Sequence, residues 1–484
     1  MKISKKWLSQ YMDLSDMSIE EIADKITSAG LEVEGIEKMS QGSNLVIGKV
    51  ISCEDHPDSD HLHVCQVDLG DKIEQIVCGA PNVTAGQKVI VARVGAKLLG
   101  GDIKAGVIRG QESNGMICSL LELGVDPHQL SEESKNGIEV LDEDAPVGNE
   151  NPLGYLALDD EILDVGLTPN RNDCMAAWSM ALETGAILHK EVNIPYVEGA
   201  SNVGEASRLI VRSETEKCPL FLGKVINSVT IKPSPKWMQE LLMAAGMKSI
   251  NNVVDISNIV AGNRGGAFLI LMLFRHRNRS EIRRFDYTLD GSYHIEEDDI
   301  VITTEGKPIG IAGIMGGDDS KIEETTKGII IEAAIFHHVS IRNTSRRLNL
   351  GTDASVRYQK GIEPMATFKA VDRAVQLLIE YADASGLEET KQYGSNGYTP
   401  LEFDVNLDRI NVLLGTDFQQ EEVMKVLDDL HLEPSVNNSD IHVKIPSYRM
   451  DLAIEADIAE EIIRILGYER LPSTMPKMPS TVGA

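Results

Sequence analysis

The feature that most constrains the fold is a run of short β-strand signals between residues 45 and 119. Val and Ile recur with polar residues in four stretches, Leu45–Ser52, Leu62–Asp68, Glu74–Cys78 and Lys88–Val94. Glycines and a proline stand in the joins between these stretches. Short strands separated by such turn residues are typical of a small Greek-key barrel. We therefore predict a β-barrel over residues 40–150.

Basic side chains gather in the second half of this predicted barrel. They are Lys88, Arg93, Lys97, Lys104 and Arg109, and they outnumber the nearby Asp102 and Glu112. A local excess of Lys and Arg can follow the phosphates of a nucleic acid. A short basic cluster can equally be an ordinary solvated surface. The residues alone leave both interpretations open.

Length and charge limit the class of protein. A chain of 484 residues is expected to form several domains. Its net charge of −29 argues against non-specific coating of nucleic acids or of anionic membranes, so any RNA contact must use local basic patches. The six cysteines form no CxxC pair, and we find neither a signal peptide nor a run of about 18 to 20 apolar residues. These features predict a cytoplasmic protein with reduced thiols and no membrane partner.

The rest of the chain predicts an α+β multidomain protein with the barrel inserted in a small α/β domain. Ser18 and Glu21 form a capping box at the start of an early helix. Helices are expected over 235–245, 364–384, 417–430 and 453–466, and strands over 299–303, 328–333 and 442–446. The predicted units are the small α/β domain (1–39 with 151–200), the barrel (40–150), a larger α+β domain (210–394), a winged or helix-turn-helix-like domain (400–475) and a linker to missing domains (476–484).

Two clusters suggest metal ligands. The first contains Cys53, His56, His61, His63 and Cys65, of which the last three alternate and would share one strand face too closely for a tetrahedral zinc site. We predict an acidic turn there instead. The second cluster is Asp451, Asp457, Glu460 and Glu461. Helical spacing stacks three of these carboxylates, which suits Mg²⁺ or, alternatively, complements the positive end of the helix dipole.

The glycine-rich segment IAGIMGG, residues 311–317, does not fit a phosphate-binding loop. It lacks the Lys and the Ser or Thr of such a loop, and its glycines do not follow the GxGxxG spacing. We predict a tight turn lining a small-molecule pocket. Neither a hydrolase triad nor an ATP-binding signature is visible, so the residues alone give little support for catalysis by this chain.

Several strings occur in an order that points to one family. They are MKISKKWLSQYMDL, the barrel strings GAPNVTAGQKV and RGQESNGMICS, LTPNRNDC, INNVVDISN, IAGIMGG, TDASVRYQKGIEP and SYRMDLAIEADIAEEIIRILGYERLPSTMP. The barrel strings resemble a tRNA-binding OB-fold module. Together, the strings resemble the β subunit of bacterial phenylalanine–tRNA ligase over nearly the whole chain. Family β chains continue for several hundred residues, so we expect an N-terminal portion.

The resemblance implies different roles for an α subunit and a β subunit. In this family an α subunit holds the site where ATP and phenylalanine react, and the β subunit supports α2β2 assembly, tRNA(Phe) binding and removal of mischarged tyrosine. By resemblance, the editing pocket comprises Ser257, Asn258, Gly313, Glu332, Thr352 and Ala354, with Glu332 accepting a hydrogen bond from the tyrosine hydroxyl. The same resemblance assigns the second carboxylate cluster to Mg²⁺ shared with the α subunit. A free-standing tRNA-binding or trans-editing protein is the alternative.

One segment, 261–286, departs from the family pattern. The pattern continues after DISNIV roughly as MLExGQPLHAFD, whereas this chain reads AGNRGGAFLILMLFRHRNRSEIRR. Codons can be chosen for Arg275–Arg284 such that the next reading frame gives AIGTDQKFV, which continues the family pattern plausibly. We infer a pair of compensating frameshifts, with a divergent basic loop as the alternative.

This departure predicts impaired removal of mischarged tyrosine, because the loop expected to close the pocket is replaced and errors of about 1 Å can cost on the order of a hundredfold in rate. Restoring the GQPLHAFD pattern should therefore raise the rate of Tyr-tRNA deacylation. The two sequences would be compared after being joined to the further domains and an α subunit. Equal rates would show that the divergent loop works as well.

Overall fold

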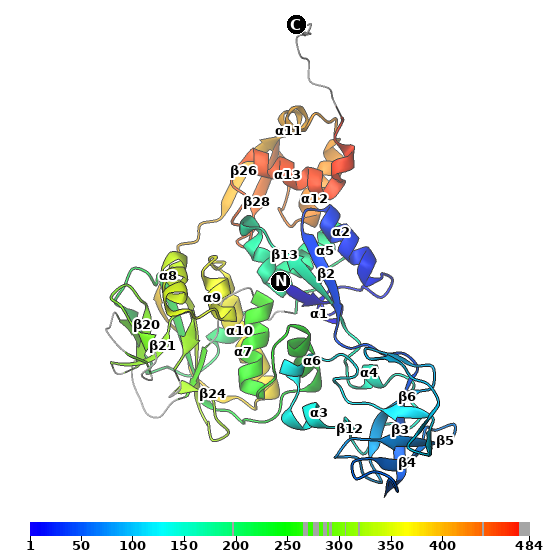
Figure 1. Cartoon of the computed structure of the whole chain (residues 1–484). Helices are drawn as coiled ribbons and strands as arrows, with labels where there is room; N and C mark the ends of the chain where they lie inside the picture. Colours follow the sequence, from blue (N-terminus) through cyan, green and yellow to red (C-terminus); the bar gives the residue numbers. More distant parts are fainter. Residues whose placement is uncertain are drawn as a thin grey trace, which may run out of the picture.

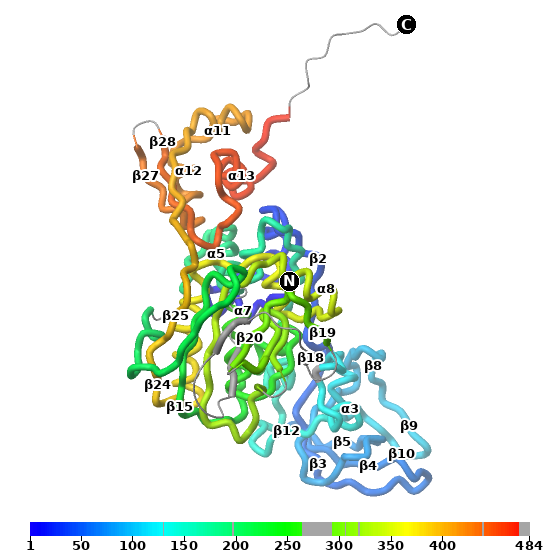
Figure 2. Tube along the Cα trace, turned by 90° about the vertical axis from the view of Figure 1, so that its left-hand side faces the viewer, coloured from blue at the N-terminus to red at the C-terminus, as the bar shows by residue number. Residues whose placement is uncertain are grey.

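The computed structural model describes residues 1–195, 198–264, 293–304, 306–317, 320–437 and 440–473, and the backbone of three short strands between 265 and 292. Within these residues, no helix is long and apolar enough to cross a membrane. Figures 1 and 2 show a central N-terminal unit between a C-terminal unit and the β-barrel, with a larger α+β unit beside it. The architecture is mixed α/β, as the sequence predicts.

The N-terminal sheet is completed by a strand from beyond the barrel. Its antiparallel order is β1 (Lys2–Ser4), β13 (Glu161–Gly166) and β2 (Glu32–Lys38), with β13 in the middle. Its core is shared with helices α1 (Lys5–Leu8), α2 (Ile19–Ser28) and α5 (Ala177–Leu188). The predicted capping box of Ser18 and Glu21 is confirmed at the start of α2. Segments on both sides of the barrel therefore form one unit.

The barrel sheet is nearly closed. Its strand order is β11–β6–β3–β4–β5, with β12 beside β6. The bounds are β3 (Leu45–Asp55), β4 (His63–Asp68), β5 (Ile73–Cys78), β6 (Lys88–Arg93), β11 (Gly115–Ile117) and β12 (Val140–Leu141). Beside β5, the Asn114 N–H donates to the Gln75 carbonyl at 2.9 Å. The four central strands are confirmed to within three residues of the predicted stretches.

Two short hairpins and two short helices surround the main sheet of the barrel. Two hairpins project from it, β7 with β8 and β9 with β10, and two short helices follow. Their bounds are β7 (Lys97–Leu98), β8 (Gly101–Asp102), β9 (Gly106–Ile108), β10 (Gln111–Ser113), α3 (Glu132–Asn136) and α4 (Pro152–Tyr155). The Val77 N–H donates to the Ser113 hydroxyl at 3.1 Å, so the second hairpin helps to close the barrel.

The larger unit contains two sheets with different helical partners. One sheet has the order β16–β23–β15–β24 with β25 beside β15, and the other has the order β14–β17–β20–β21–β22. The first sheet comprises β15 (Leu220–Ser228), β16 (Ile270–Leu273), β23 (Ile329–Ile335), β24 (Ser385–Leu387) and β25 (Lys391–Gly394). The second comprises β14 (Val211–Ser213), β17 (Ser280–Arg283), β20 (Val301–Thr304), β21 (Lys307–Ile311) and β22 (Met315–Gly316). A separate pair is formed by β18 (Thr288–Leu289) and β19 (Tyr293–His294).

Five helices divide between these sheets. The first sheet shares its core with α6 (Lys236–Ala244), α7 (Asn252–Arg264) and α10 (Ala366–Tyr381). The second shares its core with α8 (His338–Leu348) and α9 (Asp353–Tyr358). The predicted helices over 235–245 and 364–384 correspond to α6 and α10, whereas α7, α8 and α9 were not predicted from periodicity.

The C-terminal unit is a small sheet with three helices. Its strands run in the order β26 (Leu401–Asn406), β28 (Asp440–Ile445) and β27 (Ser435–Asn437), and its helices are α11 (Leu407–Leu414), α12 (Gln420–Asp429) and α13 (Glu455–Leu466). The strand and two helices expected there are confirmed as β28, α12 and α13. The adjoining β26 and α11 were missed.

Buried ion pairs join the C-terminal unit to the N-terminal unit. Arg464 of α13 pairs with both Glu183 of α5 and Glu461. Arg171 extends the network to Asp173, and Arg449 extends it to Asp451. All seven side chains are at most 11% exposed. Burial by itself raises the pKa of Glu183, but Arg464 and Arg171 outweigh this effect and hold that pKa well below its usual range.

Replacing Arg464 with Met should destabilise the fold strongly. The change leaves Glu183 and Glu461 buried beside fewer guanidinium groups, and removing one partner of a buried ion pair typically costs about 3 to 5 kcal/mol. Urea unfolding at neutral pH measures the loss. The loss should shrink in acid, because protonation of the abandoned carboxylates removes their buried charge.

The matched control is Arg409→Met, which removes an exposed arginine paired with Glu455. It should shift the unfolding midpoint little. Equal midpoints for the two variants would show that the buried network does not hold the units together.

Candidate functional site

The five basic residues predicted to bind RNA differ in what they contact. Lys88 Nζ donates to the carbonyls of Glu143 and Ala145 at 2.5 and 2.6 Å, and Arg93 forms a two-bond pair with Asp71. Arg109 donates to the Asp58 carbonyl at 3.1 Å while remaining exposed. Lys97 and Lys104 are exposed, and among the described residues neither ammonium group has a polar partner. The positive face is therefore smaller than the sequence suggests.

The barrel as a whole is acidic. Residues 40–150 contain eight Lys and Arg against eighteen Asp and Glu, and no Phe, Tyr or Trp. Single-stranded nucleic acid usually stacks on aromatic rings, which this segment lacks. Any RNA contact of the barrel must consequently use its few exposed cations and its aliphatic surface.

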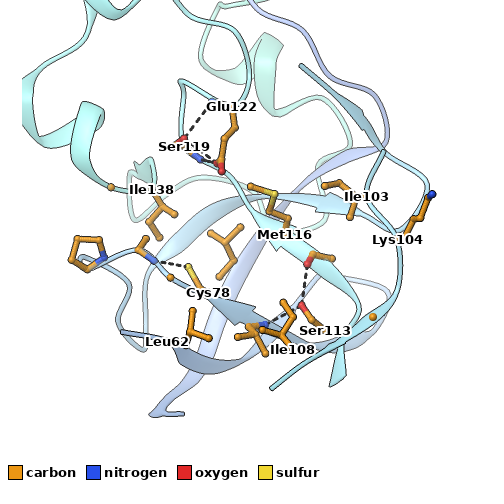
Figure 3. Close-up of a pocket in the computed structure, with 18 of the residues that line it drawn as sticks. Leu62, Cys78, Ile103, Lys104, Ile108, Ser113, Met116, Ser119, Glu122 and Ile138 are labelled. Atoms are coloured by element: carbon orange, nitrogen blue, oxygen red, sulfur yellow. Dashed lines mark hydrogen bonds between the residues drawn. The ribbon is translucent and has the colours of Figure 1, made fainter. Parts of the chain in front are cut away.

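A cavity of about 650 Å³ opens beside Lys104 (Figure 3). Its apolar wall includes Ile103, Ile108, Met116 and Ile138. Glu122 stands at the opposite side from Ile108, and its Oε2 accepts hydrogen bonds from the backbone and hydroxyl of Ser119 at 2.7 and 2.9 Å. Apolar walls with a few polar groups are typical of small-ligand sites.

The Cys and His cluster has local partners. Cys53 and Cys65 lie opposite each other on β3 and β4, with their sulfur atoms 3.6 Å apart. His56 accepts from the Asp58 N–H through Nδ1 at 3.0 Å, and its Nε2 lies 3.2 Å from the Ile108 carbonyl. Across the described parts of the chain, no group of three or more Cys, His, Asp or Glu is placed to hold a metal ion.

The four carboxylates assigned to Mg²⁺ by resemblance are not brought together. Asp451 and Glu461 are bound by arginines of the buried network. Asp457 accepts from the backbone N–H groups of Ala453 and Ile454 at 2.8 and 2.9 Å, so it caps α13, and Glu460 is exposed. Carboxylates neutralised by guanidinium or backbone donors are poor ligands for a divalent cation. These residues do not fit the expected metal site, and the helix-end interpretation describes Asp457.

Gly313 of the expected editing pocket lies against Tyr358 of α9, and the pocket residues Thr352 and Ala354 belong to the start of the same helix. A Cβ on Gly313 would lie 2.9 Å from the ring of Tyr358, and Gly313 has a φ of +64°, so only glycine fits this turn. Thr352 caps α9 and donates its hydroxyl proton to the Ile314 carbonyl at 2.7 Å. Ala354 is buried in the same helix. Segment 311–317 is thus the tight turn that the sequence predicts.

Glu332 is a buried carboxyl on the neighbouring strand. It is 2% exposed, and among the described residues its Oε2 has no hydrogen-bond partner. Burial raises the pKa of Glu332 to about 8. It shares one face of β23 with Ala334, whose carbonyl accepts from the Tyr358 hydroxyl at 3.2 Å. A buried oxygen without a donor is poised to accept or share a proton with a ligand.

Ser257 and Asn258 lie on α7, away from these residues. The apolar side chains of α7 pack in the same core as Ile331 and Ala333, which point to the opposite face of β23 from Glu332. The structure therefore places the sheet between this part of the expected pocket and Glu332. The divergent segment 261–286 falls largely outside the described residues, although Asn263 accepts hydrogen bonds from Trp7 and Tyr11 within the core.

Three protein-family models match successive parts of the chain. Residues 45–150 match a putative tRNA binding domain, residues 217–383 a B3/4 domain, and residues 403–468 a tRNA synthetase B5 domain. The phenylalanine–tRNA ligase β subunit of Streptococcus pneumoniae is 40% identical over 100% of this chain and 61% of that protein. The β subunit of Geobacillus kaustophilus is 41% identical over 98% of this chain and 61% of its own length.

The chain belongs to the phenylalanine–tRNA ligase β-subunit family. It spans 61% of the length of these relatives. Among solved structures, an N-terminal fragment of the phenylalanyl-tRNA synthetase β subunit from Pyrococcus horikoshii is 12% identical, with a TM-score of 0.41, over 96% of this chain and 99% of that one. The β-subunit resemblance of the sequence motifs is confirmed.

Sequence reasoning missed two residues that organise this part of the β-subunit fold. Tyr358 holds Gly313 and Ala334 together; it stands in the family string TDASVRYQKGIEP, but the sequence does not show that its ring packs against the glycine-rich turn. Lys224 is fully buried, and its ammonium group donates to the carbonyls of Ser201, Val203 and Glu388. The only available signal for Lys224 was a lysine within the apolar run of β15.

The raised pKa of Glu332 predicts a specific dependence of stability on pH. In the unfolded chain this carboxyl ionises near 4.5, whereas the folded protein holds the proton to about pH 8. Stability should therefore fall as pH rises between these values, by about 5 kcal/mol. Glu332→Gln should remove this fall. Urea unfolding of both proteins at several pH values measures it, and parallel pH profiles would contradict the assignment.

Proposed function

We propose that this chain is the tRNA-binding part of a phenylalanine–tRNA ligase β subunit and carries its editing pocket in an impaired form. The observation that carries the proposal is the 40% identity of the whole chain to such a subunit, together with a buried oxygen of Glu332 that has no partner among the described residues. The barrel and an α subunit would cooperate in binding tRNA(Phe). Cytoplasmic location and assembly as an α2β2 heterotetramer belong to the same proposal.

In this proposal, Glu332 distinguishes tyrosine from phenylalanine. A phenolic hydroxyl can donate to the unsatisfied Oε2, whereas a phenylalanine ring would leave a buried polar group without a partner. The turn at Gly313 and the hydroxyl of Thr352 would position the aminoacyl end. Ser257 and Asn258 would act only indirectly, because α7 packs on the other face of the sheet.

The synthetic reaction requires components beyond this chain. We assign ATP and phenylalanine to the α subunit, which would attach the amino acid to tRNA. Mg²⁺ would also be held there, since Asp451, Asp457 and Glu461 are already committed to other contacts. This chain alone is not expected to aminoacylate tRNA.

The deciding experiment is co-purification with a phenylalanine–tRNA ligase α subunit, followed by assays of aminoacylation and Tyr-tRNA(Phe) deacylation. The chain would be extended with the remaining domains of a relative for these assays. We expect a stable complex that charges tRNA with phenylalanine, and a loss of discrimination between Tyr-tRNA and Phe-tRNA in Glu332→Ala. Retained tRNA binding together with a failure to co-purify with any α subunit would instead support a free-standing RNA-binding or trans-editing protein.

A further inference from the structure

Helix α8 carries a row of basic side chains that have no acidic partner among the described residues. His338, Arg342 and Arg346 follow one another at four-residue intervals, so they share one face of the helix. His338 and Arg346 are exposed, and Arg342 is half-buried. Neither guanidinium group makes a hydrogen bond or ion pair with any described residue. The helix contains no Asp or Glu.

The orientation of this basic row is fixed by the opposite side of α8. Thr344 donates its hydroxyl proton to Asp299 at 2.5 Å, and Arg347 pairs with the same carboxylate and donates to the His294 carbonyl at 2.9 Å. These contacts hold the inner face of the helix against the sheet, so the basic row stays directed toward solvent.

Arg342 and Arg346 have no anionic partner in the described part of the chain, although the net charge of −29 provides many possible ones. Partial burial, followed by the neighbouring His337 and Arg342, lowers the pKa of His338, so at neutral pH the positive charge of the row comes from Arg342 and Arg346. Like charges held close together cost free energy unless an anion relieves them. The row is therefore suited to a ligand with several negative charges.

The position of the row favours RNA as that ligand. The chain continues from Arg346 through Leu350 to Thr352, whose hydroxyl contacts the turn at Gly313 and Ile314. Figure 1 shows α8 beside α9. Protein interfaces usually need an apolar core, but none of the exposed large apolar side chains in the described structure lies on α8. A nucleic acid backbone needs no such core.

We propose that His338, Arg342 and Arg346 bind the phosphate backbone of a tRNA and guide its aminoacyl end toward Gly313 and Thr352. This inference rests on the proposed tRNA-binding function. It adds an RNA contact outside the barrel. Within the barrel, Lys97, Lys104 and Arg109 are exposed, whereas Lys88 and Arg93 are half-buried. The acidic body would repel the tRNA elsewhere and so restrict it to these basic surfaces.

The test measures binding of a tRNA(Phe) transcript to the full 484-residue chain at several salt concentrations. The variant Arg342→Gln/Arg346→Gln should lower the slope of log affinity against log salt by about 1.4 to 1.8, at roughly 0.7 to 0.9 per lost phosphate contact. The variant Arg342→Lys/Arg346→Lys should keep the slope, since charge is preserved. The control Arg409→Gln/Arg470→Gln removes two exposed, ion-paired arginines and should also keep it.

Three different results would each overturn a specific part of the inference. A wild-type slope in Arg342→Gln/Arg346→Gln would remove α8 from the RNA interface but leave tRNA binding by the chain intact. The same slope with lost co-purification of the α subunit would make the row a protein interface. Absence of salt-dependent tRNA binding by the unaltered chain would overturn the proposed tRNA-binding function together with this inference. Thermal unfolding of every variant verifies that the fold is retained.

Discussion

The buried pairing of Arg464 with Glu183 and Glu461 is the interaction on which the arrangement of the units depends. It brings α13 against α5, although Glu183 and Arg464 are 281 residues apart in the chain. Desolvating such charges is costly, so the geometry must satisfy nearly every donor and acceptor. The two flanking arginines, Arg171 and Arg449, do this by binding further carboxylates. The result is a junction that tolerates little relative movement.

This junction also explains why local pattern was misleading at α13. Helical spacing correctly places Asp457, Glu460 and Glu461 near one another, but spacing cannot reveal which distant arginine will meet them. The same limit applies in the barrel, where the strands are visible as alternating Val and Ile. From the sequence, Lys88 and Arg93 are expected to be free cations. The structure shows that Lys88 contacts residues 143 and 145 and that Arg93 pairs with Asp71.

The larger unit contains one feature that the sequence predicts and another that it does not. The glycine-rich turn could be predicted because its conformation is local, and the structure adds the reason, which is the ring of Tyr358 against Gly313. By contrast, the sequence does not show that Glu332 and α7 lie on opposite faces of the sheet that contains β23, because the topology of the whole unit sets those positions. Glu332 itself illustrates a trade between stability and recognition, because a carboxyl buried without a donor weakens the fold while offering a selective contact to a ligand.

The central position of β13 has a consequence for how the chain is made. During synthesis on the ribosome, β1 and β2 emerge early, but the strand that joins them follows more than a hundred residues later. The strands of the barrel between them pair only with one another and can form before β13 is made, although Ile162 of β13 and Ala244 of α6 complete one of its cores. The N-terminal sheet forms only after β13 has been synthesised. A folded barrel brings β13 closer to β1 and β2 than an unfolded segment of the same length would, which lowers the entropy cost of pairing the three strands.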